Sequence, residues 1–154
     1  MAGRIDSRLA ELGVILPPAA APVANYVPWV VSGKLLFIAG QVTFKDGKPQ
    51  YIGQLGRDFG VEDGAKAARL CAINILAQVK AAVGDLDRVA RCVKLTGFVN
   101  ATPDFKDHPK VVNGASDLMV EVFGDAGKHA RAAVGVASLP LGVAVEVDAI
   151  FELA

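Results

Sequence analysis

The feature of this sequence that most constrains its fold is a long amphipathic segment between Val61 and Val83. Its apolar residues recur three or four positions apart, and most of its charged and amide side chains fall outside that stripe. Glu62 and Asp63 occupy the first turn, where the helix dipole favours negative charge, and Gly84 follows the last turn. The spacing predicts one helix over 61–83, whose apolar face needs a sheet or another helix to pack against.

Shorter segments on both sides of this helix follow strand and helix patterns in turn. The proline- and alanine-rich stretch 17–22 cannot continue a helix, because proline lacks the backbone donor and fixes φ. Residues 1–21 are therefore interpreted as an N-terminal extension with one short helix and an extended lead-in. The other predicted elements are a helix over Ile5–Leu12, strands over Trp29–Ser32, Leu35–Phe44 and Val89–Asn100, a helix over His108–Phe123, and strands over Ala130–Val136 and Val143–Phe151.

The order of these elements, ββ-α-β-α-ββ, is typical of an α+β fold with two main helices on one face of a single sheet. The 154 residues suit one compact unit, and no linker or internal repeat divides them. We therefore predict a single domain over 1–154.

Charge and hydropathy argue against several classes of protein. Lys plus Arg and Asp plus Glu both total 16, so the formal net charge is zero, whereas nucleic-acid-binding proteins usually carry a basic excess on one face. No segment is apolar enough for a signal peptide or a membrane span, so we expect a cytoplasmic protein without a membrane partner. Cys71 and Cys92 lie in apolar stretches without a nearby histidine at metal-ligand spacing, and we expect both to be buried and reduced.

The last predicted strand has two unlike faces. One face carries valines at 143, 145 and 147 and can contact the helices. The other face carries small, acidic and apolar residues, namely Ala144, Glu146, Asp148 and Ile150. This mixture suits either a face that packs against other subunits, leaving a polar crevice that includes Arg131, or an ordinary solvated face. The pattern alone does not decide between the two.

Two charged residues in apolar strand sequences are candidates for the chemistry. Arg131 stands among small residues, and its planar guanidinium matches a carboxylate or phosphate; the alternative is an ion pair with Glu146 or Asp148. Glu146 is either a general base or an ion-pair partner. His108 and His129 are far apart in sequence and lack an obvious acidic partner, so we predict neither a metal site nor a histidine-based triad.

Several segments together resemble the RidA (YjgF) family. An arginine is followed by a Leu-Pro turn and then by a Val-Glu strand, all within 130–147, and this long motif resembles the family's C-terminal signature. The resemblance runs from about Pro22 to the C-terminus. Its other matching positions are Tyr26, Ile38-Ala39-Gly40-Gln41, Phe98-Val99-Asn100 and Val111-Val112-Asn113.

The resemblance implies a chorismate-mutase-like α+β fold with one mixed sheet. Members of the family assemble as homotrimers whose sheets form a central barrel, and their ligands bind in clefts between adjacent subunits. The best-known members hydrolyse reactive enamines and imines, such as 2-aminoacrylate and related 2-imino acids, to 2-keto acids and ammonia. The resemblance implies no metal and no organic cofactor, and a small carboxylate-bearing metabolite as the partner.

The resemblance also implies roles for particular residues. Arg131 matches the arginine that holds the substrate carboxylate, and Glu146 matches the glutamate that positions or activates the attacking water. Tyr26 and Asn113 match residues that line the cleft, and Gly40 matches a glycine whose backbone approaches the ligand. An imine of a keto acid needs a carboxylate anchor and a polarised water near its C=N carbon, so this assignment is chemically coherent.

Two further substrate-binding positions depart from the family pattern. Ala39 stands where the archetype has a serine before Gly-Gln, and Ala133 stands where it has a cysteine two residues after the arginine. The N-terminal extension and the 44–60 loop are also longer than in the compact archetype. These departures predict a divergent subgroup that keeps carboxylate binding and has altered or weakened imine hydrolysis.

Three alternatives remain open at the level of sequence. The first is a non-catalytic trimer that binds or senses a small carboxylate metabolite. The second is an endoribonuclease, an activity ascribed to some members of the family, although the neutral charge balance and the lack of a histidine pair argue against it. The third is an amidohydrolase or ring-opening enzyme of a degradation pathway.

Overall fold

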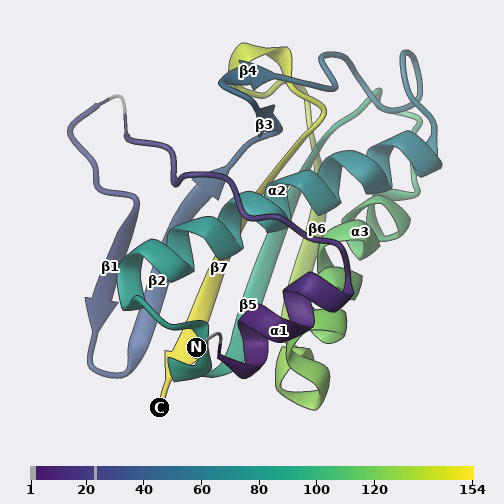
Figure 1. Cartoon of the computed structure of the whole chain (residues 1–154). Helices are drawn as coiled ribbons and strands as arrows, with labels where there is room; N and C mark the ends of the chain where they lie inside the picture. The colour runs from purple at the N-terminus through teal and green to yellow at the C-terminus, as the bar shows by residue number, and fades with distance from the viewer. Residues whose placement is uncertain (1–2, 23) are drawn as a thin grey trace.

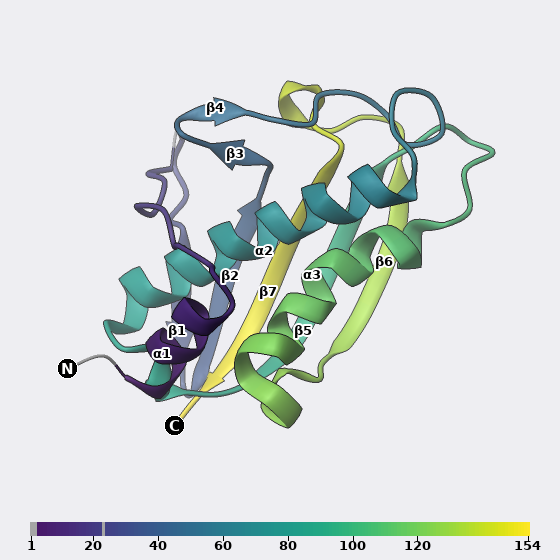
Figure 2. The ribbon, with the colours of Figure 1, turned by 45° about the vertical axis from the view of Figure 1, so that its right-hand side comes forward.

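A five-stranded mixed sheet carries the long helices on one of its faces (Figures 1 and 2). This computed structural model describes residues 3–22 and 24–154, so residues 1 and 2 of the predicted extension lie outside the described residues. The strands are ordered β1-β2-β7-β5-β6, and β1 and β6 form the two edges. Only β5 and β6 pair in parallel; the other neighbours are antiparallel. The strands are β1 (Trp29–Ser32), β2 (Leu35–Gln41), β5 (Val89–Asn100), β6 (Ala130–Val136) and β7 (Val145–Leu153).

Two helices, α2 (Val61–Val83) and α3 (His108–Phe123), lie side by side on this sheet (Figure 2). The bounds of both agree with the prediction, and so do those of β1, β5 and β6. The middle of the apolar face of α2 is fully buried, with Ala68, Cys71, Ala72, Ile75 and Val79 at zero exposure. The predicted α+β class, with both main helices on one face, is confirmed. Within the described residues, no helix combines the length and apolar character that crossing a bilayer requires.

The close approach of these helices depends on positions that lack a side chain. A Cβ atom at Gly114 of α3 would overlap the backbone carbonyl of Ala65 on α2. A Cβ atom at Gly97 of β5 would overlap the side chain of Val112, which is fully buried. Both glycines therefore set how near α3 lies to its neighbours.

The N-terminal extension contains α1 (Arg4–Glu11), which begins and ends one residue earlier than predicted. Residues outside the helix hold it in place. Its buried residues Ile5 and Leu9 join the core. The first turn has no side-chain cap of its own; instead the Asp87 carboxylate accepts from the backbone N–H groups of Arg4 and Ile5, both at 2.8 Å. These backbone donors lower the pKa of Asp87. Asp87 belongs to a short 3-10 helix, η1 (Leu86–Arg88), directly before β5.

The predicted strand over 35–44 is wrong at its end. β2 stops at Gln41 after an irregularity in its pairing with β7, and 44–45 form a separate hairpin, β3 (Phe44–Lys45) with β4 (Lys48–Pro49). The Asn74 side chain of α2 donates to the carbonyls of Val42 and Phe44, both at 3.0 Å. These carbonyls bond to a helix side chain instead of a neighbouring strand, so the chain leaves the sheet.

The predicted start of the last strand at Val143 is also wrong, since β7 begins at Val145. Val143 forms an isolated bridge with Ile52, and the Ala144 N–H donates to the Tyr51 carbonyl. The 44–60 loop thus binds these two residues. They follow a 3-10 turn, η3 (Pro140–Gly142), in which Leu141 has a φ of 61°.

The cysteines are buried and unpaired, as expected. Cys71 faces the carbonyl of Val145, with its Sγ atom 3.4 Å from the oxygen. Burial raises the pKa of both thiols, that of Cys92 to about 12. Neither thiol is therefore ionised near neutral pH, and both act as small apolar groups.

We expect Gly114→Ala to lower the free energy of unfolding by about 1–3 kcal/mol, because the new methyl meets a backbone carbonyl that cannot rotate aside. The helix preference of alanine, about 1 kcal/mol, acts in the opposite direction. Gly64→Ala on the facing helix is the matched comparison, since the atoms nearest to its methyl belong to the side chains of Leu55 and Val111 and not to backbone. Urea unfolding at one protein concentration should show the larger loss for Gly114→Ala; equal stability of that variant and wild type would contradict the close approach.

Candidate functional site

The predicted site residues fall into two groups on opposite sides of the sheet. Gly97 faces α3, and it pairs with Ala133 of β6 and with Val147 of β7, so these two residues also face the helices. Arg131, two positions before Ala133, is on this helix side. Glu146, next to Val147, is on the far side. One of the two interpretations of the mixed face of the last strand put Arg131 in a crevice on that face; the register of the sheet places Arg131 on the helix side instead.

The first group surrounds Arg131 on the edge strand β6. Its Nη1 donates to the side-chain oxygen of Asn113 at 2.7 Å and to the hydroxyl oxygen of Ser116 at 3.2 Å, both on α3. Within residues 3–22 and 24–154, Arg131 forms no ion pair with Glu146 or Asp148, so that alternative does not describe this chain. The remaining donors, Nε and Nη2, have no hydrogen-bond partner in the described part of the chain.

A histidine for which the sequence predicted no role contacts this group. His129 places Nε2 2.8 Å from the Ser116 hydroxyl and Nδ1 2.6 Å from the carbonyl of Gly127. Its ring is half-buried, like the side chains of Ser116 and Arg131. Two spacings in the sequence could have signalled this cluster: Asn113 and Ser116 are one helical turn apart, and His129 and Arg131 are two residues apart along an extended segment.

The second group centres on Glu146 in β7. A Cβ atom at Gly40 of β2 would overlap the Glu146 carboxylate, so a larger residue at position 40 would require this carboxyl group to move. Burial raises the pKa of Glu146, and the neighbouring Asp148 carboxylate raises it further. The structure thus brings together Gly40 and Glu146, which the resemblance assigns to one cleft. A half-buried carboxyl group with a raised pKa can accept and release a proton.

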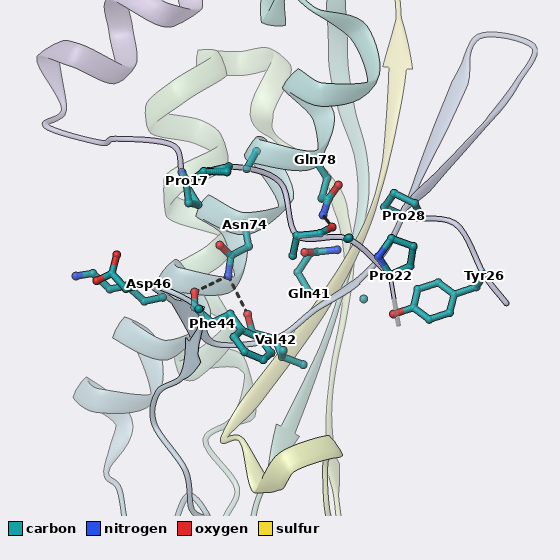
Figure 3. A pocket seen from close by; sticks show the side chains of 17 residues that line it. Pro17, Pro22, Tyr26, Pro28, Gln41, Val42, Phe44, Asp46, Asn74 and Gln78 are labelled. Atoms are coloured by element: carbon teal, nitrogen blue, oxygen red, sulfur yellow. Dashed lines mark hydrogen bonds between the residues drawn. The ribbon is translucent and has the colours of Figure 1, made fainter. Parts of the chain in front are cut away.

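A pocket of about 510 Å³ opens next to Gly40 (Figure 3). Tyr26 lines it and is 52% exposed, and neither Arg131 nor Glu146 belongs to its lining. Asn74 and Gln78 reach it from α2, and Gln78 donates to the carbonyl of Ala20 in the lead-in at 2.9 Å. The lead-in therefore forms one wall of the pocket.

The two departures from the family pattern lie apart from each other. Ala39 is half-buried beside Gly40, and its N–H donates to the carbonyl of Pro28 at 3.0 Å. Ala133 is half-buried on the helix side, against the core. Ala39 thus belongs with Glu146 and Ala133 with Arg131, so each group has lost one polar side chain relative to the archetype.

Among the described residues, no three His, Cys, Asp or Glu side chains gather closely enough to bind a metal ion. The polar groups of the site are the guanidinium of Arg131, the carboxyl of Glu146, the amide of Asn113, the hydroxyl of Ser116 and the imidazole of His129. Groups of these kinds can bind anions and transfer protons.

Comparison with known proteins agrees with this arrangement of sheet, helices and side chains. A family model with the description "YjgF/chorismate mutase-like, putative endoribonuclease" matches residues 6–153. The chain belongs to the YjgF family. Its fold is accordingly the chorismate-mutase-like α+β fold that the resemblance implied.

Relatives of this YjgF-family chain match over nearly their whole length. Protein TCP17 from Trypanosoma cruzi is 53% identical over 152 residues, which are 98% of this chain and 95% of that protein. An Agrobacterium tumefaciens protein of unknown function, known from a crystal structure, is 52% identical in sequence. The match covers 97% of this chain and 92% of that protein's chain, with a TM-score of 0.92. TdcF from E. coli, solved with bound serine, is 27% identical over 88% of this chain and 94% of its own, with a TM-score of 0.65.

We expect Glu146→Gln to raise the melting temperature at neutral pH. Because the pKa of Glu146 is raised in the folded protein, folding favours the protonated form, and the cost of ionisation appears as the pH rises above the unfolded pKa of about 4.3. This cost is absent below that value, so the two proteins should converge in acid. Melting curves across this range measure the effect. Asp148→Asn, which removes the smaller cause, should give a smaller gain; equal curves for Glu146→Gln and wild type at neutral pH would contradict the raised pKa.

Proposed function

We propose that this protein hydrolyses reactive enamines and imines, 2-aminoacrylate or related 2-imino acids, to 2-keto acids and ammonia. The observation that carries the proposal is the state of Arg131 at the sheet edge. One guanidinium nitrogen is held by Asn113 and Ser116, and the other two have no protein partner among the described residues. Such an arrangement suits a ligand with one carboxylate, which accepts two parallel hydrogen bonds from a guanidinium.

A carboxylate ligand also agrees with a relative. TdcF was solved with bound serine, an amino acid that carries a carboxylate, and it shares the fold. In this proposal the substrate carboxylate binds Nε and Nη2 of Arg131. This contact fixes the position of the reacting carbon, which is one bond away from the carboxylate.

We propose further that the site is completed by a second copy of the chain, within a homotrimer. Arg131 and Glu146 lie on opposite sides of their own sheet, so one chain cannot direct both at one substrate. The far side of the sheet also carries uncovered apolar residues, and this supports burial against other subunits. Among these residues are Val30, Phe37 and Val134, at 51%, 39% and 43% exposure.

In the assembled site, Glu146 of the neighbouring copy is the general base for the water molecule that attacks the imine. The carboxylate takes a proton from the water as the water oxygen bonds to the C=N carbon, and the carboxyl group then donates this proton to the imine nitrogen, which gives a carbinolamine. In the second step the carboxylate takes the hydroxyl proton of the carbinolamine and donates it to the nitrogen as the C–N bond breaks, so that ammonia leaves and the carbonyl of the 2-keto acid forms. A carboxyl group whose pKa burial raises suits both directions of proton transfer.

Non-catalytic binding of a small carboxylate metabolite is the second candidate. Ala39 and Ala133 each replace a polar side chain of the archetype, one in each half of the site. A hydroxyl contributes about 0.5–1.5 kcal/mol through a hydrogen bond, so binding through Arg131 would survive where turnover is weakened. The family description also names an endoribonuclease, but the balanced charge of the sequence offers no excess of basic residues for RNA.

We expect Arg131→Ala to lower kcat/KM for imine hydrolysis by about tenfold to a hundredfold, because charge-assisted hydrogen bonds contribute about 1.5–3 kcal/mol. Imines are generated in situ by an enzyme that consumes amino acids, and their decay and the released ammonia are followed. Arg91→Ala, at an exposed arginine on β5, is the matched control and should keep wild-type activity.

The same assay separates the candidate functions. A wild-type protein that 2-keto acids stabilise, but that releases no ammonia, would support the carboxylate binder and overturn the hydrolase. RNA cleavage that weakens with salt would favour the endoribonuclease. Arg131→Ala with full activity would exclude Arg131 as the anchor.

Mixed oligomers test the shared site. We expect Arg131→Ala and Glu146→Gln each to lose most of their activity alone and to recover part of it when they are co-expressed, because some boundaries then combine an intact arginine with an intact glutamate. Random assembly leaves about a quarter of the sites intact in a cyclic oligomer. The measurement is the activity of the purified mixture. A mixture no more active than its components would contradict a site that combines Arg131 of one copy with Glu146 of another.

A further inference from the structure

A chain of hydrogen bonds runs from the backbone of the 3-10 helix η2 (Gly124–Gly127) to the guanidinium of Arg131. The Gly127 carbonyl bonds to Nδ1 of His129, Nε2 of His129 bonds to the Ser116 hydroxyl, and the Ser116 oxygen accepts from Arg131. Sequence analysis assigned no role to His129, and it did not single out Ser116.

The direction of every bond follows from its partners. A carbonyl oxygen can only accept, so Nδ1 of His129 carries a proton and donates to Gly127. In the neutral ring, Nε2 is then an acceptor, and the Ser116 hydroxyl donates its proton to it. The hydroxyl oxygen keeps its lone pairs for the Arg131 Nη1 donor at 3.2 Å. His129 therefore holds the hydroxyl hydrogen of Ser116 away from the arginine, whose guanidinium can only donate.

The starting point of this chain is itself fixed by packing. Gly127 is buried, and a Cβ atom there would overlap the backbone of Met119 on α3. The turn is thus pressed directly onto the helix that carries Ser116. The two ring nitrogens of His129 therefore bond to one residue of α3, Ser116, and to one residue packed against α3, Gly127.

We propose that Ser116 and His129 are positioning residues that set the orientation of the anion-binding side of Arg131. A guanidinium is planar, so holding Nη1 between Asn113 and Ser116 restricts the plane and leaves Nε and Nη2 as a pair of parallel donors. Donors ordered before binding lose less entropy when the ligand arrives. The inference deepens the proposed function and rests on it for the nature of the ligand.

The distances also resemble those of a serine nucleophile and its base. Ser116 lies in the middle of α3, however, where the backbone N–H groups bond within the helix and are not free to stabilise an oxyanion. Its oxygen also accepts from Arg131, which agrees with a structural partner. The geometry therefore favours positioning over nucleophilic attack.

The test compares Ser116→Ala, His129→Ala and His129→Gln with wild type and with His108→Ala. His108 is the only other histidine and lies under Gly135, outside this chain of bonds. The first measurement needs no ligand: NMR of the imidazole nitrogens reports the tautomer of His129, and NMR of the guanidinium reports the rotation of Arg131 about its Nε–Cζ bond. The second is the Kd of 2-oxobutanoate by calorimetry, and the third is the division of imine hydrolysis between KM and kcat.

We expect a proton on Nδ1 of His129 in wild type. Ser116→Ala and His129→Ala should speed the rotation of Arg131 and raise the Kd and the KM by about three- to tenfold, the range for one net hydrogen bond. kcat should change less than KM. His129→Gln should recover part of the loss, because its amide oxygen can accept from Ser116, and His108→Ala should match wild type.

Unchanged rotation and affinity in both alanine variants would overturn the inference, as would a proton on Nε2 of His129 in wild type. If wild type hydrolyses imines and the alanine variants match it in rotation, Kd and KM, the positioning role is excluded and the proposed hydrolase activity is not affected. Faster rotation and weaker 2-oxobutanoate binding in a protein without imine hydrolysis would remove the hydrolase and support the positioning role. If wild type does not bind 2-oxobutanoate, the rotation and the tautomer decide alone. Should His129→Ala fail to fold, Ser116→Ala and His129→Gln provide the same comparison.

Discussion

The approach of α3 to the edge of the sheet is the constraint on which the candidate site depends. Arg131 comes from the edge strand β6, whereas Asn113 and Ser116 come from α3, so a hydrogen bond of 2.7 Å requires helix and strand to be held together closely. Glycines permit this spacing on several sides of the helix. They are Gly97 under Val112, Gly114 against Ala65, Gly127 against Met119 and Gly135 against His108. Residues without side chains thus fix the distance at which the polar side chains meet.

The sheet also divides the chemistry of the site. Arg131, the proposed anion-binding residue, lies on the side that the helices cover, at an open edge, and Glu146, the proposed proton-transfer group, lies on the uncovered side. Such a division gives each chain an incomplete site and makes oligomerisation a condition of the proposed activity. The apolar residues on the uncovered side supply a physical reason for that association.

The long helices and the central strands could be predicted from the sequence because their signals are local. The stripe of α2 and the glycines after α2 and α3 define bounds that the structure reproduces. The end of β2 could not be predicted, since an apolar run does not show that Asn74 of a distant helix binds the carbonyls of Val42 and Phe44. In the site, the family motif indicated Arg131 and Asn113, which the structure brings together. The side of the sheet on which Arg131 lies depends on register, and the partners of His129 include a backbone carbonyl, so neither could be read from residue types.

The capping of α1 has a consequence for the order of folding. Eight residues are too few for a stable isolated helix in water, and the first turn of α1 obtains its acceptors from Asp87, more than eighty positions along the chain. During synthesis the segment leaves the ribosome before α2, η1 and β5 exist. The first turn of α1 therefore lacks its hydrogen-bond acceptors until the turn that carries Asp87 has emerged. The docking of α1 therefore depends on a segment that is made after α2, and an ordered α1 indicates that the turn before β5 is in place.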